Sequence, residues 1–458
     1  MTNDMTRGNP TRLIISFTLP VLFGNLCQQL YGMVDSIIVG RAISMEALAA
    51  VGATSGISFL VIGCIQGLTA GFSVITAQRF GAGDYEGVKR SVATSALLSL
   101  AATVLLTAAG ILTARPLLEV MNTPADIIED SYAYIIVIYY GVAATAFYNL
   151  LSCIIRALGD SKTPLIFFEY SPLFLNVALD LLFIITFHMG VGGAAWATVL
   201  SQGVSGLLCL GYAWRRFPLL RMEKRHWTFD WSYAWKHLRL ALPMAMQFVI
   251  TGTSVLVNQA VLNLFGSAAV AAFSAASKIH MLSEQVAVSF GTAMATYAGQ
   301  NYGAGKAGRV REGLRKCTLA CEAITLGIMV IMTAFGGVMS SWFIDGYHPE
   351  VIQQAHLYLF ISALFYPALT MLFLYRNTLL GLGNGVTPML AGVCELLSRM
   401  IGAPVLGYFF GFTGLCWINP IAWVTASGLL FLSYRKTMRN IRPVDPTVDA
   451  SDSNKIMN

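Results

Sequence analysis

Charged side chains are scarce in this 458-residue chain, in which Lys, Arg, Asp and Glu make up 11% and hydrophobic residues 56%. A soluble globular domain carries about 25% charged residues. The 29 basic and 23 acidic residues cannot cover the surface of a soluble particle of this length. The shortage excludes an ordinary cytosolic enzyme, a disordered protein and a nucleic-acid-binding protein.

Motifs of enzymes and metal sites are also missing. No Walker-type phosphate loop, HExxH or GxSxG motif stands in a usable context, so transport energised by ATP on this chain is unsupported. Most of the eight cysteines lie in apolar runs, where a thiol behaves as a small hydrophobe. Cys317 and Cys321 are one helical turn apart, but no His or second Cys pair is near them in the sequence. We expect no metal site, disulfide or cofactor.

Long apolar runs are abundant instead, and the mean hydropathy is +0.65. A helix that crosses a bilayer needs roughly 20 apolar residues. The polar start is followed by an apolar run too long for a signal core, which predicts a retained first span. Apolar windows predict an all-α polytopic membrane protein with twelve spans at about 12–40, 46–76, 91–114, 127–155, 163–187, 190–214, 238–265, 269–299, 314–342, 351–380, 387–410 and 413–434.

The basic residues predict how the chain is oriented. If the N-terminus is cytoplasmic, the loops and tails on that side hold 25 of the 29 basic residues, whereas the outer loops hold only Arg41 and Arg115. Such a bias is typical of a multi-pass protein in the cell membrane with both termini in the cytoplasm. Residues 215–237 separate the first six predicted spans from the last six. We expect them to form an amphipathic cytoplasmic connector or a plain polar linker.

The two halves of the chain resemble each other at nearly constant offsets. Leu19-Pro20 recurs as Leu242-Pro243, Gln78-Arg79-Phe80-Gly81-Ala82-Gly83 as Gln300-Asn301-Tyr302-Gly303-Ala304-Gly305, Ala157-Leu158-Gly159-Asp160 as Gly381-Leu382-Gly383-Asn384, and Gly190, Gly193 and Trp196 as Gly411, Gly414 and Trp417, at offsets of 223, 222, 224 and 221 residues. The sequence therefore predicts a duplicated six-span unit, with lobes at 1–214 and 238–436 and a polar tail at 437–458. An even span number makes the repeats parallel, and parallel repeats bind substrate at their interface.

Ionisable side chains inside a membrane span are costly, so each is a functional candidate. They are Asp35, Glu169, Asp180, Lys278, Glu284, Glu322, Glu395 and Arg399. Glu395 and Arg399 are four residues apart on one helix, which favours a self-neutralising salt bridge. The sequence assigns no role to Lys278 or Glu284.

The first half holds the strongest candidate cluster. Asn25, Gln28, Tyr31 and Asp35 form one polar stripe on the first span. Counting from the outer ends of their helices places Asp35 and Asp180 roughly 9–12 Å below the surface, with Asn176 and Thr198 nearby. Two carboxylates in a poorly solvated cavity cannot both ionise cheaply, so the cluster is expected to exchange a proton or hold a monovalent cation; the alternative is a buried structural network. Pro20 weakens the first span and is a candidate for bending.

These patterns resemble the multidrug and toxic compound extrusion (MATE) family over about residues 10–436. The resemblance is carried by Leu19-Pro20 with Asp35, by the two QxxGAG segments, by RALGDSKTP after the fourth span and by GVGGAAWAT opening the sixth. It implies a V-shaped 6+6 bundle with alternating access. Asp35, Asn176, Asp180 and Thr198 look like the N-lobe cation site of the DinF-like branch. The resemblance implies that Asn149 also belongs to this cation site, although counting residues along the fourth span places it nearer the cytoplasmic end.

The resemblance implies a transporter, not an enzyme, that exports cationic or amphipathic organic compounds in antiport with H⁺ or Na⁺, and we expect it to act as a monomer. Asp35, Asp180, Asn176, Thr198 and Asn149 would bind the coupling cation, and Pro20, Tyr31 and Gln28 are candidates for substrate contact or gating. The tenth span carries no acid, so a C-lobe sodium site is not expected. Two alternatives remain open: a lipid-linked glycan flippase or polysaccharide exporter, which would need a cationic groove, and a polytopic acyltransferase, which would need a nucleophile or a His–carboxylate site.

Overall fold

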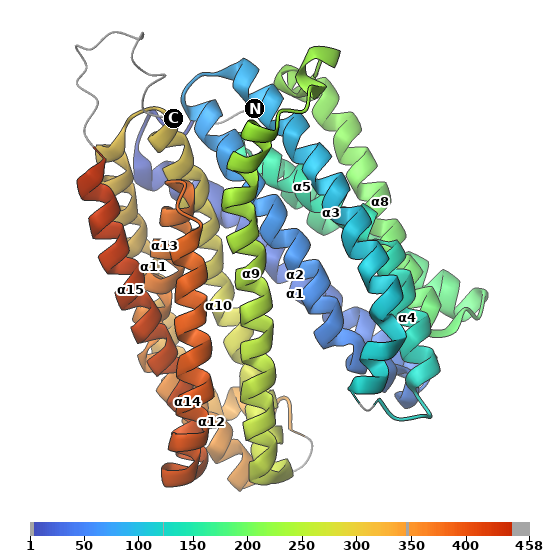
Figure 1. Ribbon diagram of the computed structural model, residues 1–458. Coiled ribbons are helices and arrows are strands. Elements are labelled where there is room, and N and C mark those ends of the chain that lie inside the picture. Colours follow the sequence, from blue (N-terminus) through green and yellow to red (C-terminus); the bar gives the residue numbers. More distant parts are fainter. Residues whose placement is uncertain (1–3, 122, 345–347, 442–458) are drawn as a thin grey trace.

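The computed structural model describes residues 4–121, 123–344 and 348–441 (Figure 1). All regular elements in these ranges are helices, as the sequence predicts. The part of the expected tail after Ile441 and the side chain of Glu169 lie outside what the structure describes. Inside a bilayer every backbone polar group needs a partner within the protein, which helices supply.

The first half of the chain forms the N-lobe. Its elements are α1 (Pro10–Ala42), α2 (Met45–Gly81), α3 (Tyr85–Val120), α4 (Ile128–Tyr140), α5 (Val142–Ala157), α6 (Lys162–Pro164), the π-helical segment η1 (Leu165–Tyr170), α7 (Ser171–Asp180), the π-helical segment η2 (Leu181–Thr186) and α8 (Gly190–Arg216). Side chains at the start of three of these helices accept hydrogen bonds from exposed backbone N–H groups: Asn9, Ser44 and Asp84. These caps fix where the helices begin.

The second half forms the C-lobe after a connector. The connector contains two 3₁₀ turns, η3 (Pro218–Leu220) and η4 (Lys224–Trp227). The C-lobe elements are α9 (Trp231–Leu262), η5 (Asn263–Phe265), α10 (Gly266–Gly303), α11 (Ala307–Ser341), α12 (Pro349–Leu364), α13 (Tyr366–Gly381), α14 (Val386–Cys416) and α15 (Ile418–Asn440). Because α9 begins at Trp231, where Asp230 caps it, the last part of the expected connector is helical.

In the part of the chain that the structure describes, eight helical segments are long and apolar enough to cross a membrane, and ten if each bent pair counts as one span. One of the eight, Trp231–Gly303, comprises both α9 and α10. The expected fourth and tenth spans are each broken into two helices, with bends of 47° between α4 and α5 and of 53° between α12 and α13. With α15 as the last helix, all twelve expected spans correspond to helices of the structure.

The two lobes meet at one end of the molecule and diverge towards the other (Figure 1). Both described chain ends lie where the lobes meet. We call this the basic end, because it carries the α2–α3 and α10–α11 turns and the connector, where most basic residues are found. The lobes exchange packing there: Ile14, Phe17 and Val21 of α1 join the core of α10 and α11, and Ala241 and Ala245 of α9 join the core of α2. Each lobe's first helix therefore also belongs to the interface.

Glycines allow the lobes to come into contact at the basic end. A Cβ atom on Gly81 would collide with the backbone carbonyl of Gln300, and a Cβ on Gly303 would collide with that of Gln78. Gln78 Nε2 donates to the carbonyl of Gly381 and Gln300 Nε2 donates to that of Ala157, both at 2.8 Å. The two halves of this contact are related by the sequence duplication, so the same residues close the basic end from both sides. We call Gln78, Gly81, Gln300 and Gly303 the interlobe contact.

Candidate functional site

The polar stripe of α1 leads from the interlobe region into the N-lobe. Asn25 Nδ2 donates to Ser289 Oγ of α10 at 3.1 Å, so the beginning of the stripe contacts the C-lobe. Gln28 is exposed, and Tyr31 and Asp35 lie one and two turns further along, partly buried in the N-lobe. Pro20 lies within α1, which is helical from Pro10 to Ala42.

Two π-helical segments frame the part of the chain that supplies the remaining polar groups. Asn176 and Asp180 lie on α7, and both are fully buried. This helix is flanked by η1 and η2. Such π-helical turns are rare and are found frequently at functional sites, because they locally change the direction of side chains and free backbone groups.

The side chains of α1, α7 and α8 converge. Tyr31 Oη and Thr198 Oγ1 are 2.9 Å apart and share a hydrogen bond. Asn176 Nδ2 donates to Thr198 Oγ1 at 3.3 Å. The carboxyl groups of Asp35 and Asp180 lie close enough to interact electrostatically. We call these five residues the N-lobe pocket.

Among the described residues, the acids of the N-lobe pocket have no basic partner. The ion pairs formed among the described residues include neither Asp35 nor Asp180. Asp35 Oδ1, Asn176 Oδ1 and both carboxylate oxygens of Asp180 are buried and have no hydrogen-bond partner in the described part of the chain. Buried carboxylates are stable only when they are neutralised. Oxygen donors of this kind suit a proton or a hard cation rather than a soft metal.

The structure separates Asn149 from the pocket's hydrogen bonds. Asn149 Nδ2 donates to the carbonyl of Thr145 on its own helix, α5, at 2.9 Å. Tyr134 of α4, to which the sequence pattern did not point, lies close enough to interact electrostatically with Asp35 and Asp180. The duplication offers a signal for Tyr134, since Tyr358 stands at the equivalent position of the second repeat.

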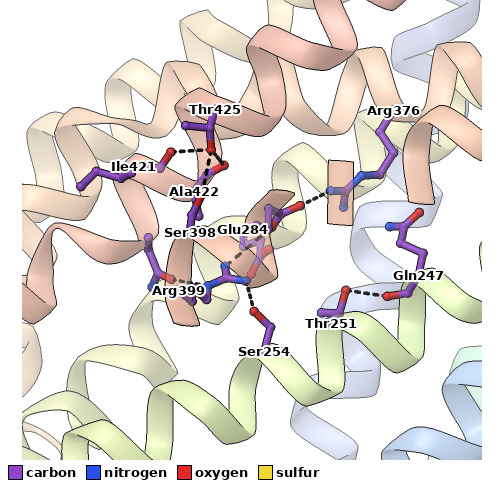
Figure 2. A network of polar contacts seen from close by, with 12 residues as sticks. Gln247, Thr251, Ser254, Glu284, Arg376, Ser398, Arg399, Ile421, Ala422 and Thr425 are labelled. Carbon is purple, nitrogen blue, oxygen red and sulfur yellow. Dashed lines mark hydrogen bonds and ion pairs between the residues drawn. The ribbon is translucent and has the colours of Figure 1, made fainter. Parts of the chain in front are cut away.

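The C-lobe has a charged network of its own (Figure 2). The expected pair between Glu395 and Arg399 is present at 3.6 Å. Glu395 also pairs with Arg376, to which the sequence assigned no role. Arg376 lies within α13 and is buried. Glu284 of α10 lies near all three charges.

The other expected candidates are placed outside both clusters. Lys278 Nζ lies over the ring of Phe343 at 5.3 Å, and Glu322 is near the hydroxyl of Thr325 on its own helix, at 3.5 Å. No group of three or more His, Cys, Asp and Glu residues that could hold a metal is found in the described residues.

Known proteins share this architecture. The MatE family model matches the chain twice, over residues 20–182 and 243–405. The chain belongs to the MatE family. Each match begins at the proline inside the first helix of a lobe, Pro20 or Pro243, which agrees with the duplication seen in the sequence. The resemblance noted from the sequence motifs is thereby confirmed, and the chain is a multi-pass membrane protein.

Relatives of this MatE chain cover almost its whole length. A probable multidrug resistance protein, YpnP, from Bacillus subtilis is 29% identical over 434 residues, which are 94% of each chain. A probable multidrug resistance protein, NorM, from Thermotoga maritima is 27% identical over 92% of each chain. A solved structure described as the outward-facing conformation of a multidrug resistance MATE family transporter superposes with a TM-score of 0.88 at 24% identity, covering 95% of this chain and 98% of the other. The twelve-helix 6+6 fold is therefore that of MATE transporters.

Proposed function

We propose that this protein is a secondary transporter that exports cationic or amphipathic organic compounds across the cell membrane in exchange for H⁺ or Na⁺. The observation that carries the proposal is the Asp35–Asp180 pair, two neighbouring carboxyl groups with three buried oxygens that have no hydrogen-bond partner and no basic partner among the described residues. The names of its relatives as multidrug resistance proteins support the substrate class. We take the basic end to be cytoplasmic, because positive charge accumulates there.

The pocket couples a charge change to a helix that joins the lobes. The second half of α1 carries Asp35 into the N-lobe, while its first half packs on the C-lobe core. When a cation from outside neutralises the acid pair, the cost of keeping α1 and α7 together falls, and Tyr31, Asn176 and Thr198 can close around the pocket. Pro20 lies between the two halves of α1, where a missing backbone hydrogen bond lets the helix bend. Bending would reshape the space between the lobes and expel the bound compound.

Alternating access requires the interlobe contact to break. In this structure the lobes are closed at the basic end through Gln78, Gly81, Gln300 and Gly303. Substrate from the cytoplasm can enter only when this contact opens. We assign to this opening the release of the cation to the cytoplasm, which returns the N-lobe to its charged state. An acid pair that is buried in the bilayer without its cation is the state of higher free energy.

Everted membrane vesicles that contain the protein test the proposal. A fluorescent organic cation is added, and a proton gradient or a sodium gradient is imposed separately. We expect one of the two gradients to drive uptake of the dye into the vesicles, and an ionophore for that ion to abolish it. ATP added in the presence of both ionophores should have no effect. Uptake that needs ATP, or that neither gradient drives, would exclude ion-coupled export.

A further inference from the structure

The C-lobe holds a polar cluster at the place that the duplication relates to the N-lobe pocket. The offset of 223 residues between Pro20 and Pro243 relates Tyr31 to Ser254, and the offset of 221 between Gly190 and Gly411 relates Thr198 to Asn419. In the C-lobe these two side chains are joined by one residue, Arg399. Its Nη1 atom donates to Ser254 Oγ at 2.8 Å and its Nε atom donates to Asn419 Oδ1 at 3.2 Å (Figure 2).

The π-helical segments show which N-lobe residue Arg399 replaces. The offset between the repeats is 224 residues before η1, at Thr163 and Thr387, and 221 after η2, at Gly190 and Gly411. A π-helical turn accommodates one more residue than an α-helical turn, and α14 is assigned as α-helix along the matching stretch. The two turns account for two of the three residues, and we place the third in the non-helical stretch 187–189, just before Gly190. Between η1 and η2 the offset is then 223, which relates Asn176 to Arg399 and Asp180 to Ala403.

The two clusters share one hydrogen bond between related residues and differ in their charges. Asn176 donates to Thr198 at 3.3 Å, and Arg399 donates to the related Asn419 at 3.2 Å. Asn419 in turn donates to Tyr358, the repeat counterpart of Tyr134. Both acids of the N-lobe pocket are replaced in the C-lobe: Asp35 corresponds to Asn258, and Asp180 to the fully buried Ala403. The C-lobe thus keeps the hydrogen bond between the counterparts of Asn176 and Thr198, loses both acids and gains a guanidinium.

Four further groups face this guanidinium. Glu395 lies on the same helix, Arg376 on α13, and Glu284 and His280 on α10. Glu395, shared by the two arginines, is 13% exposed at its side chain, and so is Arg399. Two Arg and two Glu side chains balance each other when all are charged. Such a buried network needs no ion from solution to neutralise it, in contrast to the N-lobe pocket.

We propose that the Arg399 guanidinium is a tethered cation that takes, in the C-lobe, the place that the exchangeable cation takes in the N-lobe pocket. The comparison with an exchangeable cation rests on the proposed function of Asp35 and Asp180. The C-lobe is then held permanently in the cation-bound arrangement and is the static half of the transporter. The coupling ion binds in one lobe only, although the fold contains two related polar clusters.

Chemical rescue tests this role. Arg399→Ala leaves a space the size of a guanidinium beside Glu395, and we expect a lowered Tm and loss of most transport. Guanidinium ion, at a concentration too low to affect the wild-type protein, should fill that space and raise both the Tm and the transport rate. Urea at the same concentration has nearly the same shape without the charge and should restore neither.

Two controls separate charge from packing. Arg115, exposed and paired with Glu119 and Glu129, provides a matched variant, Arg115→Ala, which should show no response to guanidinium. If Arg399→Ala does not fold, Arg399→Lys and Arg399→Gln replace it: the tethered-cation role predicts that Lys retains transport and that Gln, which can still hydrogen-bond, loses it. Equal rescue by urea, or full transport by Arg399→Gln, would overturn the proposal.

The outcome does not depend on whether the N-lobe pocket couples transport to an ion. Rescue of the Tm is measured again with Asp35→Asn added to Arg399→Ala. We expect the same guanidinium-dependent shift, because Arg399 and Asp35 lie in different lobes. If transport fails to respond to any gradient but the shift persists, the proposed function is wrong and the tethered cation stands. If the guanidinium-dependent shift in Tm is absent while a gradient drives transport, the tethered-cation proposal is wrong and the proposed function stands.

Discussion

Asp35→Asn is expected to reduce gradient-driven efflux to the level of vesicles without the protein, with normal amounts of folded protein in the membrane. Asparagine has nearly the same shape as aspartate but has no carboxyl group to neutralise. The pocket would then be fixed in its neutralised arrangement, with Asp180 free to share a hydrogen bond with the new amide. Without a change of charge in the N-lobe pocket, cation binding cannot shift the equilibrium between the two conformations of α1.

The same loss is expected for Asp180→Asn, because the two carboxyl groups act as one interacting pair. Asp126 offers a matched control: it is exposed and lies between α3 and α4, outside both lobes' pockets, so Asp126→Asn should transport like the wild type. The measurement is dye efflux per unit of purified protein in liposomes. Retained gradient-driven efflux in both pocket variants would show that the pair is only a structural network.

A disulfide across the interlobe contact should stop transport reversibly. A Cβ atom on Gly299 of α10 would lie 3.2 Å from Cβ of Ala77 on α2, slightly closer than the roughly 3.5–4.5 Å of a disulfide. Ala77→Cys with Gly299→Cys is therefore expected to cross-link when oxidised, with a small shift of one helix. The bond would hold the basic end closed, so substrate could not enter from that side and transport would be lost.

Reduction of the cross-link should restore transport, and each single variant should be active under both conditions. The experiment needs a background without the eight native cysteines, none of which forms a disulfide among the described residues. Mass spectrometry of the linked peptides gives the extent of cross-linking, and efflux is measured on the same sample. Undiminished efflux with complete cross-linking would mean that the lobes do not separate at the basic end during transport.

The sequence predicts the architecture well because membrane insertion depends on local properties. Apolar windows locate the helices, and a polar stripe such as Tyr31 and Asp35 identifies the face that cannot contact lipid. Hydropathy does not report the direction in which a helix runs, however. It could not show that the helices bend between α4 and α5 or between α12 and α13, nor that Arg376 of α13 pairs with Glu395 of α14.

The contacts within the clusters were harder to predict, because they depend on how distant helices rotate against each other. Counting along helices places Asp35, Asp180 and Thr198 at one depth, and the structure brings them together. The same counting treats Glu395 and Arg399 as an isolated pair, since neither Arg376 nor Ser254 is near them in sequence. The π-helical segments around α7 have no recognisable sequence pattern, so the equivalence of Asn176 and Arg399 needs the structure.

The most direct measurement is of the protonation and ion binding of the pocket carboxyls by difference infrared spectroscopy of the purified protein in lipid bilayers. Spectra recorded before and after raising the pH, or after adding Na⁺, should show the loss of a protonated carboxyl band from wild-type protein. The band should be absent when Asp35→Asn and Asp180→Asn are combined, and present in Asp126→Asn. An unchanged band in the double pocket variant would contradict the assignment of the exchangeable cation to these two acids.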